Sequence, residues 1–398
     1  MDNQLPEDNR PLYTFQFALL CLSSLLFSAS FNMIIPELPN YLTALGGAEH
    51  KGLIIALFTL TAGISRPFSG RLTDKWGRVP VMAIGSIVCV VCGFLYPILS
   101  SIAGFFMLRL VHGFSTGFKP TATSAYVADI VPSNRWGEAL GMHGLCFSIG
   151  GAIGPAIGSY VAADYGLNNM FYCSSGFAFL SIIIVMNMKE TLANSSRFKP
   201  NMLKISRRDI IEVRVIPAAI VTLLSYTGYG VILTLIPDWS EHLGISNKGL
   251  FFTAFTLASI GIRFLSGKVA DRYGRIVVMK VGLIIIAFSI FYIGITHSVF
   301  HLLVGACLYG IGTGIFSPAV NAWTIDLSLP QYRGKAVATM YIALEVGIGA
   351  GALFAGYIYH DVIWRIPYIM YGNSLIIFSA FIYVIYWNSK NKKIHNLL

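Results

Sequence analysis

The sequence predicts an all-α membrane protein whose twelve transmembrane helices form two six-helix bundles related by pseudo-twofold symmetry. Of its 398 residues, 55% are hydrophobic and 12% are charged, and the mean hydropathy is +0.68. A soluble domain carries roughly 25% charged residues, and a bilayer core about 30 Å thick requires about 20 apolar helical residues per crossing. The apolar runs are long and continuous, unlike the short alternating strands of a β-barrel.

Twelve apolar windows of sufficient length follow one another, at 12–36, 51–71, 78–99, 101–126, 136–162, 168–187, 215–241, 247–269, 276–296, 298–325, 333–358 and 364–388. The first window ends in Pro36 and Pro39 and lacks a small-residue cleavage pattern, which predicts a span and not a signal peptide. The sequence contains no Walker-type nucleotide-binding loop, catalytic triad or metal-ligand cluster. We therefore expect neither enzymatic activity nor a cofactor.

The formal net charge is +10, and the basic residues alternate with the order of the loops. Lys and Arg are concentrated in the even-numbered connections, in the basic segment 189–214 and in the C-terminal tail, and the exceptions are Lys51, Lys248 and Arg365. The positive-inside rule then places both termini in the cytoplasm. Because topology accounts for the basic residues, we expect a multi-pass protein of a bacterial inner membrane, in contact with lipid and without a nucleic-acid partner.

The chain contains an internal duplication. A shift of 197 residues carries Arg66 to Arg263, Asp74 to Asp271 and Asp129 to Asp326. The two halves are predicted at 1–188 and 215–398, with 189–214 as a cytoplasmic linker. Six spans per half is an even number, so both halves enter the membrane in the same orientation. Transporters use such parallel repeats to rock two bundles around a central site.

Three motifs connect this architecture to a known family. They are Gly70-x-x-x-Asp74-x-x-Gly77-Arg78, its copy from Gly267 to Arg275, and Arg109-x-x-x-Gly113-x-x-x-Gly117. Over nearly the whole chain the pattern resembles the major facilitator superfamily. The antiporter motif of its twelve-span drug:proton antiporters resembles Gly150, Gly151, Gly154, Pro155 and Gly158, and the ending Pro36-x-x-Pro39-x-Tyr41-Leu42 of the first span is similar to that branch.

The duplicated loops are predicted to control the conformational change. The resemblance implies that such a loop latches the N-terminal half to the eleventh span, and Asp74 and Arg78 offer opposite charges that can pair or meet a helix N-terminus. Asp129 is a further candidate partner of Arg78. The candidate latch residues are Gly70, Asp74, Gly77, Arg78, Asp129, Gly267, Asp271, Gly274 and Arg275. The alternative is that both loops are ordinary positive-inside turns.

The fourth span carries a polar stripe on an otherwise apolar helix. Its members fall within an arc of about 100° at 3.6 residues per turn, and they are Arg109, His112, Thr116, Lys119, Thr123 and Tyr126. Charges at membrane depth face a cavity or a partner, so we expect this stripe to line the pathway and bind substrate. The resemblance implies that Arg109 modulates proton transfer. Alternatively, the charges hold helices together.

The corresponding face of the tenth span is aromatic. Together with residues of the first and seventh spans, the predicted substrate contacts there are Asn32, Tyr226, Tyr229, Tyr309, Thr313, Phe316 and Trp323. The same aromatic side chains also suit a helix core. Because the first span lacks an acidic residue while the fourth is cationic, we expect a neutral, zwitterionic or anionic amphiphile rather than a cation.

Glu345 is the only acidic residue well inside a predicted span. A carboxylate in a low-dielectric environment favours its protonated form, so Glu345 is predicted to carry the proton or to pair with Arg109 or Lys119. A purely structural ion pair is the alternative. Glu37 and Asp238 lie near outer helix ends and are expected to be hydrated caps.

The fifth span carries Gly150, Gly154 and Gly158 at intervals of four residues, and Pro155 adds a kink between the last two. The resemblance implies a tight seam against the eighth span that limits leakage. Simple close packing of helices explains the glycines as well.

These features predict a monomeric exporter of a small amphiphilic drug or metabolite, driven by proton influx through alternating access. Three alternatives stay open: proton-coupled uptake of an anionic metabolite, a lipid or glycolipid flippase, and a membrane sensor that transports nothing.

Overall fold

The structure, a computed structural model, describes residues 11, 13–132, 135–192, 196–205, 210–329 and 332–395, apart from the side chains at 137, 264–272 and 391–395. The N-terminal half contains α1 (Phe15–Ile34), α2 (Leu38–Ala44), α3 (Lys51–Lys75), α4 (Arg78–Leu95), α5 (Ile102–Ile130), α6 (Trp136–Tyr165) and α7 (Leu167–Met186). The C-terminal half contains α8 (Ile216–His242), α9 (Gly249–Tyr273), α10 (Arg275–Gly294), α11 (Val299–Leu327), α12 (Arg333–Tyr359) and α13 (Ile366–His395). No strand occurs within the described ranges.

Short 3₁₀ turns connect several of these helices. They are Ile35–Glu37, Ala48–His50, Pro200–Leu203, Val213–Val215 and Ile363–Arg365. The first of them joins α1 to α2, so the first crossing extends over Phe15–Ala44. Each of the twelve predicted spans therefore corresponds to one long helix or helix pair, and the ends differ from the prediction by a few residues.

Among the described residues, ten helical segments are long and apolar enough to cross a membrane. The side chains described for α9 include the apolar segment Gly249–Arg263, and α5 is less hydrophobic than the ten segments. The reason for the low hydropathy of α5 is the polar stripe that includes Arg109 and Lys119. The described chain is thus a multi-pass membrane protein, with one crossing helix that is unusually polar.

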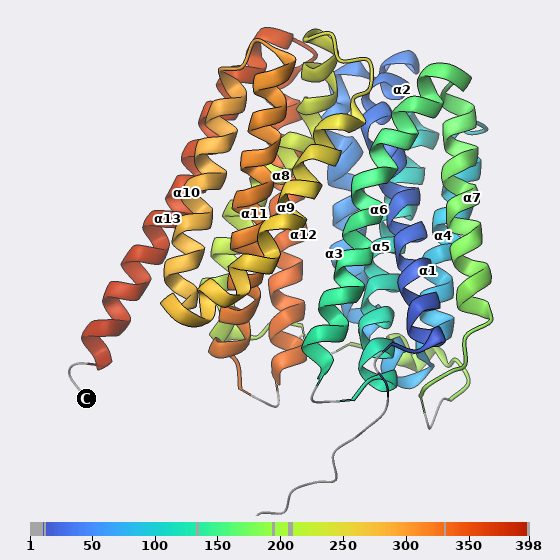
Figure 1. The fold of residues 1–398 in the computed structure, drawn as a ribbon. Coiled ribbons are helices and arrows are strands. Elements are labelled where there is room, and N and C mark those ends of the chain that lie inside the picture. The colour runs from blue at the N-terminus through green and yellow to red at the C-terminus, as the bar shows by residue number, and fades with distance from the viewer. Residues whose placement is uncertain are drawn as a thin grey trace, which may run out of the picture.

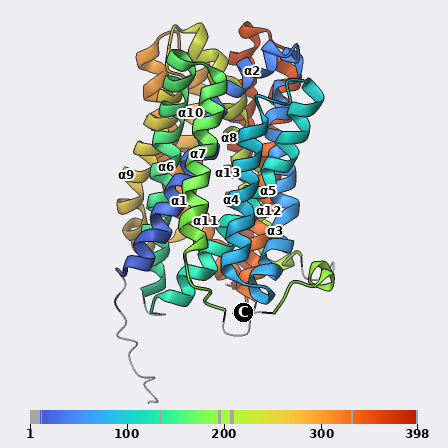
Figure 2. The ribbon, with the colours of Figure 1, turned by 90° about the vertical axis from the view of Figure 1, so that its right-hand side faces the viewer.

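The helices form two bundles that stand side by side, with α1 and α3–α7 in one and α8–α13 in the other (Figure 1). In the view turned by 90°, the long helices run between the same two ends of the molecule (Figure 2). We call the end that carries the segment 189–214 the linker end, and the opposite end, where α2 lies, the α2 end. The start of α1 and the end of α13 both lie at the linker end.

The two bundles use the same internal packing. In the N-terminal half α1 packs on α6 and α3 packs on α5, and the equivalent pairs α8 with α12 and α9 with α11 recur in the C-terminal half. Between the halves, α3 packs on α12 and α6 packs on α9. These two seams are also equivalent under the repeat, which confirms the predicted pseudo-twofold arrangement.

The repeated loops begin their helices in the same way. Gly77 and Gly274 precede α4 and α10 with φ angles of 142° and 84°, a backbone conformation that glycine adopts without steric cost. Ser101 and Ser298, again 197 residues apart, cap α5 and α11 by accepting from the backbone N–H groups of Gly104 and His301. The duplication thus includes helix caps as well as motifs.

The glycines of α6 face a different neighbour from the predicted one. A Cβ added at Gly150, Gly154 or Gly158 would lie 2.0–2.6 Å from carbonyl oxygens of α1, so these glycines allow close approach of α1 and α6. The expected seam with α9 exists, but other residues form it. Gly249 of α9 lies against the Pro155 carbonyl, and Thr253 donates to the carbonyl oxygen of Ala152 at 2.6 Å.

Candidate functional site

An ion pair crosses the seam between the two halves. The Arg66 Nη2 on α3 lies 2.7 Å from the Glu345 Oε1 on α12, and the two side chains are 15% and 8% exposed. The Arg66 guanidinium also lies 4.8 Å from the centre of the Tyr341 ring. A Cβ added at Gly63, one turn before Arg66, would lie 3.3 Å from the Glu345 Cβ, so α3 and α12 are close enough for the pair to form.

This pairing corrects the predicted partner of Glu345. The carboxylate contacts Arg66 and not Arg109 or Lys119, both of which have partners elsewhere. The Arg66 Nε is buried without a hydrogen-bond partner among the described groups. This N–H group can donate to a further ligand. A buried donor without a partner costs free energy in a low-dielectric environment, so such a bond would be favourable.

The repeat-equivalent position has different chemistry. Arg263 on α9 corresponds to Arg66, and its Nη1 lies 3.5 Å from the Ser148 Oγ on α6. The same offset of 197 relates Ser148 to Glu345. Both seams thus bring an arginine to the facing half, where Arg66 meets a carboxylate and Arg263 meets a hydroxyl. The carboxylate of Glu345 is therefore replaced by a serine at the repeat-equivalent position.

Arg109 and His112 lie inside the N-terminal half. The Arg109 Nε donates to the Ile54 carbonyl oxygen at 2.8 Å, and its guanidinium lies 4.6 Å from the centre of the Phe58 ring. The His112 ring nitrogens lie 3.2 Å from the Cys89 Sγ and 3.3 Å from the Tyr96 hydroxyl. The structure therefore engages both residues within one bundle, whereas the sequence predicted that they line the pathway.

Lys119 is held by hydroxyl groups from three helices of the same half. Its Nζ donates to the Ser23 Oγ at 2.8 Å, to the Ser86 Oγ at 3.0 Å and to the Ser181 Oγ. The ammonium also lies 4.8 Å from the centre of the Phe27 ring. Lys119 is 1% exposed, and its place is the core of the bundle rather than the interface between the halves.

The remaining members of the stripe donate to backbone carbonyl oxygens. The Thr116 and Thr123 hydroxyls donate to carbonyl oxygens of their own helix. The Tyr126 hydroxyl donates to the Lys189 carbonyl oxygen at 2.8 Å. In the first span, the Asn32 Nδ2 donates to the Ser28 carbonyl oxygen at 2.8 Å. The polar stripe is thus a network that joins helices of the N-terminal half.

Most of the predicted aromatic residues meet in the C-terminal half. The ring centres of Tyr226 and Phe316 are 6.4 Å apart, and Phe255 lies 5.9 Å from Tyr229 and 5.4 Å from Tyr309. The Thr313 hydroxyl donates to the Tyr309 carbonyl oxygen.

Trp323 lies apart from this group. Its ring packs against Trp387 of α13 with a centre distance of 4.9 Å. Tyr309, Phe316 and Trp323 are at most 4% exposed, whereas Tyr226 and Tyr229 are only partly buried. The two tyrosines of α8 are therefore more accessible than Tyr309, Phe316 and Trp323.

The latch candidates form ion pairs within each half. The Arg78 Nε lies 3.0 Å from the Asp129 Oδ2, as predicted, and the Arg78 Nη1 lies 3.6 Å from the Asp74 Oδ1. The Asp74 side chain is 73% exposed. Arg275 pairs with Asp326 in the equivalent position of the C-terminal half. The ion pair recorded for Asp74 is thus within its own half.

The other latch candidates have simpler placements. Gly70 lies in α3, where an added Cβ would meet no atom within 4 Å beyond its own stretch of helix, and Gly77 and Gly274 form the turns described above. The candidates Gly267 and Asp271 lie in the stretch 264–272, whose side chains are outside the described part of the chain.

The linker adds residues that the motifs do not contain. The Glu190 carboxylate accepts from the backbone N–H groups of Arg78 and Val79 at the start of α4, where the helix dipole favours a negative charge. The Thr191 hydroxyl donates to the Asp129 carboxylate at 2.6 Å. The first part of the linker is therefore packed against the repeated turn.

Comparison with known proteins identifies the relatives of this chain. A family model for the Major Facilitator Superfamily matches residues 20–215 and 218–397. The multidrug resistance protein MdtG of Salmonella paratyphi C is 24% identical over 395 residues, which cover 94% of both chains. An uncharacterized MFS-type transporter of Methanocaldococcus jannaschii is 24% identical over 335 residues, which cover 82% of this chain and 86% of the relative.

Solved structures share the fold at lower sequence identity. The human organic anion transporter MFSD10 is 19% identical with a TM-score of 0.71, and the match covers 94% of this chain and 100% of that one. A POT family transporter in complex with a thioalcohol-conjugated peptide is 11% identical with a TM-score of 0.78, and the match covers 95% and 96% of the two chains.

Proposed function

The chain belongs to the Major Facilitator Superfamily, and from this premise we propose that it exports a small amphiphilic compound in exchange for protons. The ion pair between Arg66 and Glu345 carries the proposal, because it places a titratable group on the contact between the two halves. The relatives named as multidrug resistance proteins support export. The distribution of Lys and Arg supports a cytoplasmic linker end and an inner-membrane location.

Protonation of Glu345 changes the contact between the halves. The ionised carboxylate attracts Arg66 across the seam between α3 and α12, and the neutral acid does not. Loss of one charge from a buried pair leaves the other uncompensated, which costs about 3–5 kcal/mol. A proton therefore shifts the equilibrium between two arrangements of the halves by changing their relative free energies. In this scheme Glu345 is the proton carrier and Arg66 is its counter-ion.

The same pair determines the sign of coupling between proton and cargo. A cargo that binds only while the pair is intact competes with the proton, as antiport requires. An anion that takes Arg66 from Glu345 instead favours protonation of the carboxylate, as symport requires, because linkage is reciprocal. The alternative function, uptake of an anionic metabolite, thus uses the same two residues with the opposite coupling.

The partly buried surface beside the pair suits an amphiphile. Tyr341 stacks under the Arg66 guanidinium, and Tyr226 of α8 and the exposed Arg263 of α9 are further candidates for cargo contacts. Aromatic faces bind apolar groups, and arginines bind anionic or polar ones. We therefore propose a neutral, zwitterionic or anionic amphiphile as cargo, moved by a monomer.

Transport by purified protein in proteoliposomes tests the proposal. With an acidic lumen and a panel of fluorescent amphiphiles, the parent protein should accumulate a compound against its gradient. Glu345→Gln should lose this accumulation while it retains exchange of labelled for unlabelled compound, and Ser148→Ala is the matched control. Accumulation by Glu345→Gln equal to the parent would contradict the role of Glu345. Accumulation only with an alkaline lumen would support the uptake alternative instead.

A further inference from the structure

Lys51 and Lys248 are two of the three exceptions to the charge pattern of the loops, and they are 197 residues apart. Both lie at the α2 end, at the start of α3 and directly before α9. Each residue is 5% exposed. A buried lysine at a helix start is unfavourable unless carboxylates compensate its charge, and both lysines have such partners.

Lys51 binds two carboxylates of the opposite half. Its Nζ lies 2.6 Å from the Asp238 Oδ2 of α8 and 2.6 Å from the Asp361 Oδ1, which follows α12. The Tyr359 hydroxyl donates to the same Asp238 oxygen at 2.8 Å. Asp238 is 8% exposed, so it is a buried ion-pair partner and not the hydrated cap that the sequence predicted.

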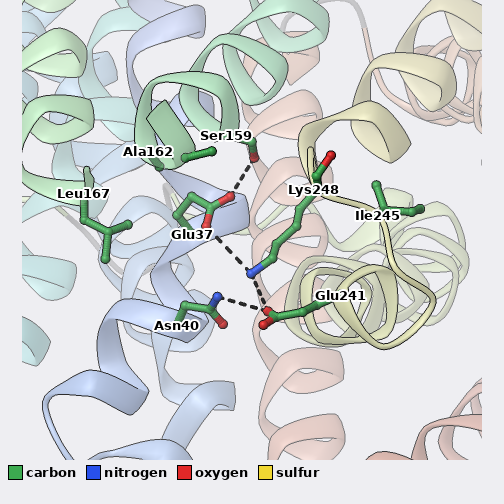
Figure 3. Close-up of a pocket in the computed structure, with 10 residues that line it drawn as sticks. Glu37, Asn40, Ser159, Ala162, Leu167, Glu241, Ile245 and Lys248 are labelled. Atoms are coloured by element: carbon green, nitrogen blue, oxygen red, sulfur yellow. Dashed lines mark hydrogen bonds and ion pairs between the residues drawn. The ribbon is translucent and has the colours of Figure 1, made fainter. Parts of the chain in front are cut away.

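Lys248 occupies the equivalent position in the C-terminal half. Its Nζ lies 2.6 Å from the Glu241 Oε2 of its own half and 3.8 Å from the Glu37 Oε2 of the N-terminal half. The Asn40 Nδ2 donates to the Glu241 carboxylate at 3.0 Å, and the Ser159 Oγ donates to the Glu37 carboxylate at 2.7 Å. Figure 3 shows these groups converging from both halves.

The two clusters differ in their access to solvent. A pocket of about 330 Å³ adjoins Lys248 and is lined by Glu37, Asn40, Ser159 and Glu241 among others. The Glu241 side chain is 58% exposed, whereas the Lys51 and Asp238 side chains are 6% and 7% exposed. Glu37 is 7% exposed and thus is also not a hydrated cap. Two carboxylates at 2.6 Å across the interface, against one at 3.8 Å for Lys248, make the Lys51 cluster the stronger connection.

The opposite end of the molecule lacks an equivalent connection in the described part of the chain. The Arg78 ion pairs stay in the N-terminal half and the Arg275 ion pair stays in the C-terminal half. Lys335 of α12 pairs with Glu212 of the linker. Charge pairs between the halves are therefore found along the seam and at the α2 end.

We propose that Lys51 and Lys248 are paired locks that hold the α2 end closed in this conformation. Opening of that end separates the halves there, so Lys51 must release Asp238 and Asp361, and Lys248 must release Glu37. Each lysine then exchanges carboxylates for water in the open state. The locks act whatever the cargo and whatever ion drives transport, so the proposal does not rest on the role of Glu345.

The distance between the halves at the α2 end tests this proposal. Nitroxide labels at Thr43 of α2 and His297 before α11, both exposed, report opening by pulsed electron paramagnetic resonance in lipid nanodiscs, in a background without native cysteines. Lys51→Met should raise the ratio of long to short distances about tenfold, and Lys248→Met should raise it about threefold. Arg365→Met is the matched control, because Arg365 lies at the same end but bonds within its own half to the Ile358 carbonyl oxygen.

A milder variant guards against misfolding of the lysine variants. Asp361 has a φ angle of 58°, which asparagine tolerates well, so Asp361→Asn removes one carboxylate of the Lys51 lock without backbone strain. It should raise the ratio of long to short distances by about threefold, which is half of the effect of Lys51→Met in free energy. Distance distributions of Lys51→Met and Asp361→Asn that match the parent would overturn the proposal. Transport by Glu345 variants has no bearing on this outcome.

Discussion

The N-terminal and C-terminal halves pack their helices in the same pairs but place different chemistry at equivalent positions. Lys119 and Phe316 are 197 residues apart, and each packs its Cβ against an equivalent glycine, Gly85 or Gly282. One position holds an ammonium among serines, and the other holds a phenyl ring. The comparison teaches that small residues preserve the bundle, while the polar residues inside it have diverged.

Exchange of the residues at this position gives the largest expected effect. Phe316→Lys places an ammonium where the C-terminal half offers Leu283 and Phe378 at the positions of Ser86 and Ser181. Burial of an unpaired charge costs several kcal/mol, so little folded protein should be recovered. The reverse change, Lys119→Met, removes a buried charge and should leave the thermal unfolding midpoint in detergent unchanged or raised. Equal yields of folded Phe316→Lys and Lys119→Met protein would contradict the claim that the two halves differ in their tolerance of a buried charge at this position.

The next effect concerns the seams between the halves. Glu345→Ser makes the seam of Arg66 resemble the seam of Arg263 and should lower proton-driven transport by about 100-fold, equivalent to about 2.7 kcal/mol. Ser148→Ala should stay within about twofold of the parent. Adding Ser148→Glu to Glu345→Ser should restore part of the rate, because a carboxylate then replaces the hydroxyl that faces Arg263 across the other seam. Initial rates of uptake into acid-loaded vesicles measure all three, and no recovery in the double variant would show that the seams are not interchangeable.

Substitution of equivalent glycines by alanine should destabilise the two halves by similar amounts. A Cβ at Gly154 would lie 2.6 Å from the Ala29 carbonyl oxygen, and one at Gly351 would lie 2.1 Å from that of Thr227. Alanine at either position should cost about 1–3 kcal/mol through overpacking. Gly151→Ala is the control, since its nearest atoms are 3.7 Å away. Thermal unfolding of the detergent-solubilised proteins measures the difference, and a wild-type midpoint for Gly351→Ala would argue against equivalent packing.

The smallest effect is expected at the repeated turns. Arg78 contacts Asp129, Asp74 and the Thr73 carbonyl oxygen with a 12% exposed side chain. Arg275 is 36% exposed, and exposed pairs contribute about 0–1 kcal/mol. Arg78→Ala should therefore lower the unfolding midpoint more than Arg275→Ala. Thermal unfolding of the detergent-solubilised variants measures both midpoints. A larger decrease for Arg275→Ala than for Arg78→Ala would contradict the expected order.

Much of the fold could be predicted because span length, charge bias and the repeat are properties of the chain itself. The partner of Glu345 could not, since helical periodicity shows which residues share a face but not which helix that face meets. The glycines of α6 illustrate the same limit, because a small face fits α1 as well as α9. A signal for the missed residues did exist: the offset of 197 relates Arg66 to Arg263 and Lys51 to Lys248.

The sequence by itself determined twelve spans, two related halves, tight turns at Gly77 and Gly274, and an isolated carboxylate at Glu345. Apolar length and backbone freedom are local properties, which explains why these features need no knowledge of neighbouring helices. Only the tertiary structure decided that Lys119 is buried among serines, that Arg66 reaches Glu345 and that Lys51 and Lys248 join the halves at the α2 end. Ion pairs and buried networks depend on distances between helices far apart in the chain, and packing of the bundles sets those distances.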